Sequence, residues 1–230
     1  MDKITPARSG VSVVVTFESP FFDWHGVTAR FFEMVHSALS SKISIEPSNF
    51  SVANGNSLGD VMARFNVFGG TSSITISAEK LSLDFPNLLP GESDLAYEII
   101  RSVESGFLKE FRECRYSTIR HMSYKHVELY QDGPISMYLQ RYAIPSVSEL
   151  CNNTDIVHMP TGRFTLTDSN ATWRALCSIE RSEVLENGLF LYSEVALMGV
   201  NMNETFDAHL ERILNIVSIC ESAFELEWEL

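Results

Sequence analysis

Residues 115–130 read RYSTIRHMSYKHVELY, and this stretch decides the fold because it is the longest strand candidate in the chain. The segment QDGP joins it to ISMYLQRY at residues 135–142. A two-residue Asp132-Gly133 turn would set apolar Met137 opposite Glu128, which mismatches the two faces. A three- or five-residue loop sets Val127 opposite Met137 instead, so we predict a central hairpin in that register.

The predicted hairpin has one apolar face and one polar, aromatic face. The polar face carries Tyr124, His126, Glu128, Tyr138, Gln140 and Tyr142. A histidine near a carboxylate can titrate close to neutral pH, which suits a site that binds a small ligand or a partner. Tyrosine also tolerates both water and burial, so an amphipathic solvent or subunit face is the alternative interpretation.

Two further hairpins follow from the hydrophobic pattern. A Gly69-Gly70 turn would set Phe65 opposite Ile74 and Ala63 opposite Ile76, so that the apolar faces agree. The stretch 173–198 contains Asn187-Gly188, a favoured hairpin turn, which would set Arg181 opposite Glu194 and Val184 opposite Leu191. Residues 11–19, VSVVVTFES, read as a strand near the sheet centre.

Three segments have apolar residues at helical spacing. The first begins after Asp23, the second after Ser93 and ends near Arg112, and the third begins around Asn203. With hairpins dominant and helices few, the sequence predicts an α+β fold with a large, mostly antiparallel sheet and three main helices covering one face. We expect a single domain over 1–230, with possible pseudo-duplicated halves 1–112 and 113–230.

The chain ends SAFELEWEL, in which Phe224, Leu226, Trp228 and Leu230 alternate with glutamates. As a continued helix, only two of these apolar residues would stay on the core side of the third helix. As a strand, all four would share one face and could dock on a sheet edge of the same chain or of a partner. The helical extension is the preferred prediction, and in either form the tail is a candidate interface.

Composition narrows the class of protein. Apolar residues make up 45% of the 230 residues and charged residues 20%, which indicates a folded chain, and no apolar run approaches the ~20 residues of a membrane helix. The net charge of −13 argues against general nucleic-acid binding. Basic residues cluster at 109–125 and acids in the last thirty residues, which suits a contact between these regions within one molecule or between copies. Two independent solvated faces are the alternative interpretation.

The four cysteines, Cys114, Cys151, Cys177 and Cys220, are far apart, and the first residues do not read as a signal peptide. We therefore expect reduced thiols in a cytoplasmic protein. No hydrolase, zinc-protease, dinucleotide or kinase motif occurs. His121 and His126 would point to opposite faces of a strand, so they cannot share a metal, and we expect neither a metal nor a cofactor.

The order of elements resembles a sporadically distributed, uncharacterised family of bacterial cytoplasmic proteins of similar length. The resemblance rests on the first strand and helix, on FRECRYSTIRHMSYKHVELY and on HLERILNIVSICESAFE. That family has an Arg-Tyr-x-Asn type motif in its mid-chain strand, whereas Arg115-Tyr116 is followed here by Ser117 and Thr118. The resemblance implies a bacterial cytoplasmic α+β protein and no catalytic residues.

Three functional hypotheses follow, in order of preference. The first is a non-catalytic binding or assembly protein, a homodimer, that uses a sheet face or edge together with the C-terminal helix and tail to hold a protein partner. The second is an acidic inhibitor or immunity-type protein that blocks a basic partner. The third is a small-ligand binder or enzyme centred on His126, Glu128 and the neighbouring tyrosines.

Overall fold

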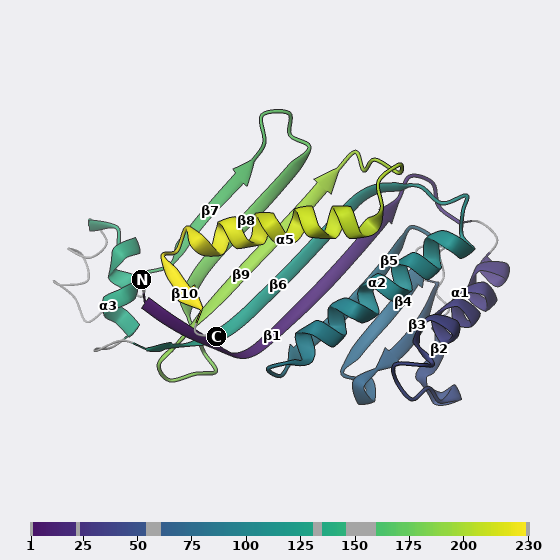
Figure 1. The fold of residues 1–230 in the computed structure, drawn as a ribbon, viewed down its shortest axis with the longest axis horizontal. Coiled ribbons are helices and arrows are strands. Elements are labelled where there is room, and N and C mark those ends of the chain that lie inside the picture. Colours follow the sequence, from purple (N-terminus) through teal and green to yellow (C-terminus); the bar gives the residue numbers. More distant parts are fainter. Residues whose placement is uncertain (1, 22–23, 54–60, 131–134, 146–159, 229–230) are drawn as a thin grey trace.

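The computed structural model of the chain describes residues 2–21, 24–53, 61–130, 135–145 and 160–228. In these residues the strands are β1 (Asp2–Phe17), β2 (Phe50–Ala53), β3 (Met62–Val67), β4 (Ser72–Ser77), β5 (Lys80–Leu88), β6 (Tyr116–Tyr130), β7 (Gly162–Thr167), β8 (Trp173–Arg181), β9 (Gly188–Met198) and β10 (Leu226–Trp228). The helices are α1 (Trp24–Leu39), α2 (Glu92–Glu110), α3 (Ile135–Leu139) and α5 (Phe206–Ser222). The predicted α+β class with a large antiparallel sheet is confirmed (Figure 1). The sequence predicts three main helices, and the described residues contain four. The fourth is the five-residue α3, which the sequence did not predict.

Nine of the strands form one antiparallel sheet in the order β2-β3-β4-β5-β1-β6-β9-β8-β7. β1 and β6 pair at its centre over most of their length. Outward from this pair, the strands on each side follow one another in reverse chain order. They are β5, β4 and β3 beside β1, and β9, β8 and β7 beside β6. A long helix follows the strand next to the centre on each side, α2 after β5 and α5 after β9. The single-domain organisation and its duplicated halves stay predictions.

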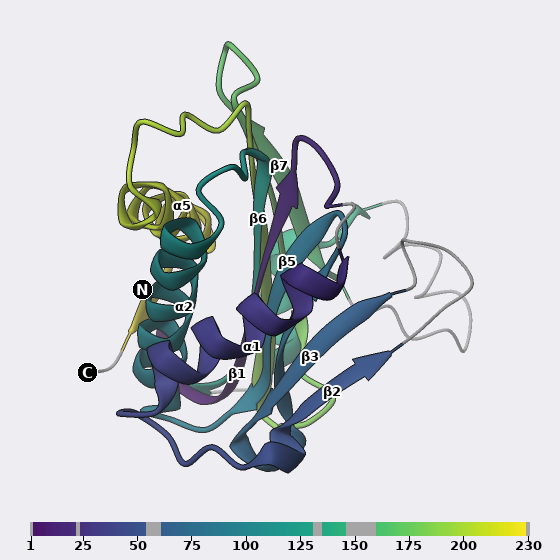
Figure 2. The ribbon, with the colours of Figure 1, turned by 90° about the vertical axis from the view of Figure 1, so that its right-hand side faces the viewer.

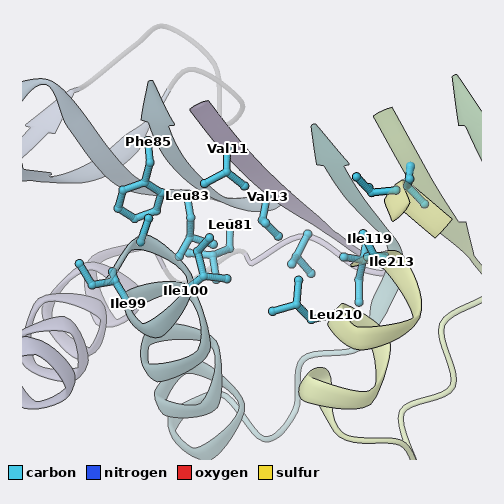
Figure 3. Packing of buried hydrophobic residues seen from close by; sticks show 14 of the residues in the cluster. Val11, Val13, Leu81, Leu83, Phe85, Ile99, Ile100, Ile119, Leu210 and Ile213 are labelled. Atoms are coloured by element: carbon cyan, nitrogen blue, oxygen red, sulfur yellow. The ribbon is translucent and has the colours of Figure 1, made fainter. Parts of the chain in front are cut away.

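The helices α1, α2 and α5 lie against the same face of the sheet, which we call the helix-covered face (Figure 2). Successive residues of a strand point to opposite faces, so every second residue of β1, β5 and β6 packs beneath these helices. Figure 3 shows Val13 and Leu83 turned toward Ile100 of α2, and Ile119 turned toward Leu210 of α5. All five side chains are fully buried. The core therefore forms between one face of the sheet and the helical stripes.

The register of the β3–β4 hairpin is as predicted, with Phe65 opposite Ile74 and Ala63 opposite Ile76. The predicted register of the β8–β9 hairpin is wrong. The strands are joined by a longer loop, residues 182–187, and Ile179 lies opposite Leu191. Both of these side chains are buried, whereas the predicted register would have set Ile179 against a residue of the other face.

The predicted central hairpin is also wrong. β6 pairs with β1 and β9, and its supposed second strand is instead α3 followed by a short 3-10 turn at Gln140–Tyr142. Ile135, Tyr138 and Leu139 are the buried residues of α3. Their spacing of three and four residues is that of a helix face, so the segment buries these three side chains without a strand partner and leaves Met137 63% exposed.

The C-terminal tail forms a strand and not the preferred helical extension. α5 ends at Ser222, Glu225 has a positive φ of 57°, and Leu226–Trp228 then pairs in parallel with residues 2–4 of β1. This is the edge of β1 that β5, which pairs with residues 9–16, leaves free. The weaker of the two tail predictions, docking on a sheet edge, is therefore confirmed for residues 226–228, and Leu230 lies outside the described residues.

The expectation of reduced thiols is wrong for two of the cysteines. Cys177 of β8 and Cys220 of α5 form a disulfide, with Cα atoms 6.2 Å apart. Both residues are fully buried, so the bond fixes α5 to the sheet from inside the core. Cys114 is a free, buried thiol whose pKa burial raises to about 12, and Cys151 lies outside the described residues.

The predicted contact between the basic stretch and the acidic C-terminal region is made within the molecule. Lys125 Nζ lies 2.6 Å from Glu221 Oε1, and the two side chains are 29% and 12% exposed. Arg101 and Arg141 make further, more exposed pairs with Asp207 and Glu225. No helix of the described residues is both long and apolar enough to cross a bilayer.

Candidate functional site

The face of the sheet opposite α1, α2 and α5, here called the helix-free face, carries the candidate site. Residues of β6 with even numbers point to it, because odd-numbered Ile119, His121 and Ser123 are buried on the helix-covered face. Residues directly opposite in a register share a face, so the helix-free face can be followed from strand to strand. Its side chains are chiefly hydroxyls, arginines and aromatic rings.

One row of this face crosses all nine strands and contains three arginines. The register partners in order are Ser51, Arg64, Thr75, Ser82, Val14, Arg120, Ala196, Arg174 and Thr167. Arg64, Arg120 and Arg174 are all exposed. With neighbouring strands ~4.8 Å apart, Arg120 and Arg174 are roughly 10 Å apart at the backbone, and Arg64 and Arg120 about 19 Å. The three guanidinium groups therefore define a line across the sheet.

Arg120 belongs to a small polar cluster with Glu194 and Tyr192 of β9. Arg120 Nε lies 3.4 Å from Glu194 Oε1, and the Tyr192 hydroxyl donates to Glu194 Oε2 at 3.0 Å. Burial, followed by the hydrogen bond to Glu194, raises the pKa of Tyr192 to about 12. Tyr192 therefore remains a proton donor at neutral pH and helps to hold the carboxylate beside Arg120.

An aromatic cluster lies next to these residues, formed by Tyr124, His126 and Phe190. The ring centroids of His126 and Phe190 are 4.9 Å apart, and those of Tyr124 and Phe190 are 5.8 Å apart. Tyr124 lies flat across Gly10 of β1, where a Cβ atom would collide with its ring, and its hydroxyl accepts the N–H of Asn87 at 3.1 Å. The glycine therefore lets the ring lie against the sheet.

A cavity of about 770 Å³ opens at the end of the helix-free face near His126. Glu180, Phe190 and the loop 182–186 line it together with His126. The Ser182 hydroxyl accepts the N–H groups of Val184 and Leu185 at 3.1 and 3.0 Å, which occupies both of its lone pairs. Its own proton is therefore donated to His126 Nδ1, 2.9 Å away.

This hydrogen bond fixes the protonation of His126. Nδ1 is an acceptor, so the neutral ring carries its proton on Nε2. Burial, and then the nearby charge of Arg8, lowers the pKa of His126 below its ordinary value. Ser182 is only 3% exposed and has no free lone pair, so it shapes the loop and does not present a nucleophile to the cavity.

The structure divides the six predicted face residues between two places. Tyr124, His126 and Glu128 share the helix-free face of β6. Tyr138 is buried, and its hydroxyl donates to the carbonyl of Phe224 at 2.6 Å. Tyr142 packs edge-on to Phe224, and Gln140 is exposed in the 3-10 turn.

The predicted tail interface is occupied within the chain. Phe224 and Leu226 are 2% and 6% exposed, and Phe224 also packs against Phe164 of β7, with centroids 5.1 Å apart. Trp228 belongs to β10. The apolar groups of Phe224 and Leu226 are therefore covered by the molecule itself.

Sequence reasoning missed Arg64, Arg174, Phe190 and Tyr192 as members of the candidate site. The alternation of inward and outward residues along each strand could have placed these four side chains on outward positions. Which of them are neighbours depends on the pairing of strands that are distant in the sequence. Within the described part of the chain, no three His, Cys, Asp or Glu side chains lie together as a metal site would require. No protein-family model matches the sequence, and no curated protein is significantly similar to it.

Proposed function

We propose that this chain is a non-catalytic binding protein that holds a protein partner on the helix-free face of its sheet. The observation that carries the proposal is the row of exposed Arg64, Arg120 and Arg174 beside the aromatic cluster of Tyr124, His126 and Phe190. Arginine and aromatic residues are enriched at protein interfaces and dominate their binding energy. The three long helices of the described residues, α1, α2 and α5, lie on the other face of the sheet (Figure 2).

The charge distribution suggests the chemistry of the partner. The helix-free face bears five exposed arginines, Arg8, Arg64, Arg120, Arg163 and Arg174, against four acids, Asp84, Glu128, Glu180 and Glu194, in a chain with a net charge of −13. A partner with an acidic patch would gain from these groups and would be repelled by much of the remaining surface. A second copy that offers an acidic part of its surface to this face would give the expected homodimer.

The two other hypotheses have less support. An acidic inhibitor would present the C-terminal acids to its target, but Glu221, Asp207 and Glu225 already pair with cations of the same chain. An enzyme centred on His126 would need an activated group beside it, and Ser182 is committed to its own loop. The cavity at His126 therefore supports binding more than bond cleavage.

The test uses affinity capture from the native host with two matched double variants. Arg120→Ser with Arg174→Ser removes two charges from the row, whereas Arg112→Ser with Arg115→Ser removes two exposed charges elsewhere. We expect the wild type and the second variant to retain the same partner and the first variant to lose it. Light scattering distinguishes a second copy from another protein. Equal capture by both variants would contradict the proposal.

A further inference from the structure

The helix-covered face contains an unexpected polar strip on β6. Its inward residues His121, Ser123 and Lys125 are polar, although they lie beside residues of α2 and α5. Their register partners on β1 include Val13 opposite His121 and Val11 opposite Ser123. A strand at the centre of a sheet would gain stability from apolar residues at these positions, so their polar character calls for a specific explanation.

His121 is the residue of this strip whose burial is least favourable for stability. Its ring is fully buried, Nε2 lies 3.0 Å from the Tyr97 hydroxyl, and Nδ1 has no hydrogen-bond partner among the residues that the structure describes. Burial, and then the charge of Lys125, lowers the pKa of His121 to about 4, so the ring is neutral at pH 7. Buried polar atoms without partners are rare and often accompany a binding site or an unseen molecule.

Ser123 and Lys125 of this strip line a cleft of about 260 Å³ between α2, α5 and the β1–β6 pair, and His121 is linked to it through the hydroxyl of Tyr97. Hydroxyl groups from four different elements line it, namely those of Ser9, Ser93, Tyr97, Ser123 and Ser218. Ser9 and Ser93 hydrogen-bond to each other at 3.0 Å and Tyr97 to His121, and each of these hydroxyls keeps a further lone pair for a ligand. Val11, Leu88, Leu214 and Val217 form its apolar walls. The cleft combines apolar walls with a few polar groups, as small-molecule sites do, but is smaller than the ~300 Å³ at which drug-sized sites begin.

The charged residues of the cleft determine the charge of the ligand. Lys125 and Glu221 both line it, and they form an ion pair with each other at 2.6 Å. A charged ligand would have to separate this pair and desolvate a new charge, which is costly in a half-buried site. A hydroxyl both donates and accepts, so the serines suit a ligand with hydroxyl or amide groups.

We propose that the cleft between α2 and α5 binds a small uncharged molecule with several hydroxyl or amide groups, no larger than a monosaccharide. The site lies between the sheet and the helices, and of the residues that carry the protein-binding surface proposed above it shares Tyr124. Residues of both sequence halves form it, since Ser9 and Tyr97 come before residue 113 and Ser123 and Ser218 after it.

Saturation-transfer NMR and thermal shift with neutral monosaccharides, inositols and nucleobases test the proposal. We expect saturable binding of at least one neutral probe and none of the matched sugar phosphates. Ser123→Ala should weaken the binding about threefold or more, because one hydrogen bond is lost. Ser193→Ala is the matched control, since Ser193 is also buried on the same face but does not line the cleft.

A second pair of variants avoids any change to the core. Ser218 and Ser222 are both exposed on α5, but only Ser218 lines the cleft. Ser218→Trp should abolish binding and Ser222→Trp should retain it. No saturable binding by any neutral probe, preference for the charged analogues, or unchanged binding in Ser218→Trp would overturn the proposal. The double arginine variant of the helix-free face should bind the probe as the wild type does, which separates this test from the previous one.

Discussion

The two central strands, β1 and β6, pair with each other and lie beneath the same helices, yet they differ in what they turn toward the core. β1 presents Val11, Val13 and Val15, all 5% exposed or less. β6 presents His121 and Ser123 at the positions opposite Val13 and Val11. Position in a sheet therefore does not fix the chemistry of a strand, and the polar residues of β6 mark a place where stability is not the only requirement.

The largest effect that this comparison predicts is at the register pair of Val13 and His121. Val13→Asp places an unpaired charge in an apolar site and should lower the free energy of unfolding by about 4–5 kcal/mol. His121→Val removes the unsatisfied Nδ1 but also the partner of the Tyr97 hydroxyl, so it should lower that free energy by only about 1–2 kcal/mol. Urea denaturation measures both. An equal loss of the free energy of unfolding in the two variants would show that β6 tolerates a substitution at this pair no better than β1 does.

A pH titration sharpens the comparison, because two buried groups near β6 respond in opposite directions. Burial raises the pKa of Glu104 of α2 from 4.5 to about 8, although the hydrogen bond from Tyr116 opposes the shift. The folded state therefore binds more protons than the unfolded state between these values, and the free energy of unfolding should fall by roughly 3–5 kcal/mol as the pH rises from 4.5 to 8.

His121 has the opposite sign. Its pKa is about 4 when folded and 6.5 when unfolded, so the free energy of unfolding should fall as the pH drops from 6.5 to 4. Glu104→Gln should remove the fall in the free energy of unfolding at rising pH, and His121→Val should remove its fall at dropping pH. Denaturation at several pH values measures both. An unchanged pH profile in Glu104→Gln would show that its carboxyl is ionised in the folded protein.

Reduction of the disulfide tests how firmly α5 is held over the polar strip. Cys177 and Cys220 close a loop with a sequence separation of 43 residues, so reduction should lower the free energy of unfolding by about 2–4 kcal/mol. Thermal melts with and without a reductant measure the change. Cys177→Ser should melt at the lower temperature under both conditions, and a wild-type melt insensitive to reductant would contradict the role of the bond.

The smallest effect is expected on the helix-free face. Arg120→Ser with Arg174→Ser should change the free energy of unfolding by less than about 0.5 kcal/mol, because Arg120 makes only an exposed pair with Glu194. Urea denaturation measures this change, with the double variant Arg112→Ser and Arg115→Ser as the control. A loss comparable to that of the core variants would mean that the row is structural.

The sequence predicted best those features that depend on the spacing of residues within one segment. The three long helices and the β3–β4 register follow from apolar periodicity, and the structure confirms them. The predicted helix starts are less accurate, because α2 begins at Glu92, before Ser93, and α5 begins at Phe206. The segment 135–142 failed because Ile135 and Leu139 suit either a strand face or a helix face, and eight residues are too few to separate the two periods. Of the candidate site, the sequence predicted Tyr124, His126 and Glu128 on one face, but not the neighbours that surround them.

The sequence alone determined the α+β class, the long helices and the inward or outward direction of the side chains of β6, because these depend on spacing along a single segment. Only the tertiary structure decided which strands flank β6, that Cys177 meets Cys220, that the tail returns to β1, and that three arginines align across the sheet. Such pairings join residues far apart in the chain, and their free energy depends on the burial that the whole fold provides.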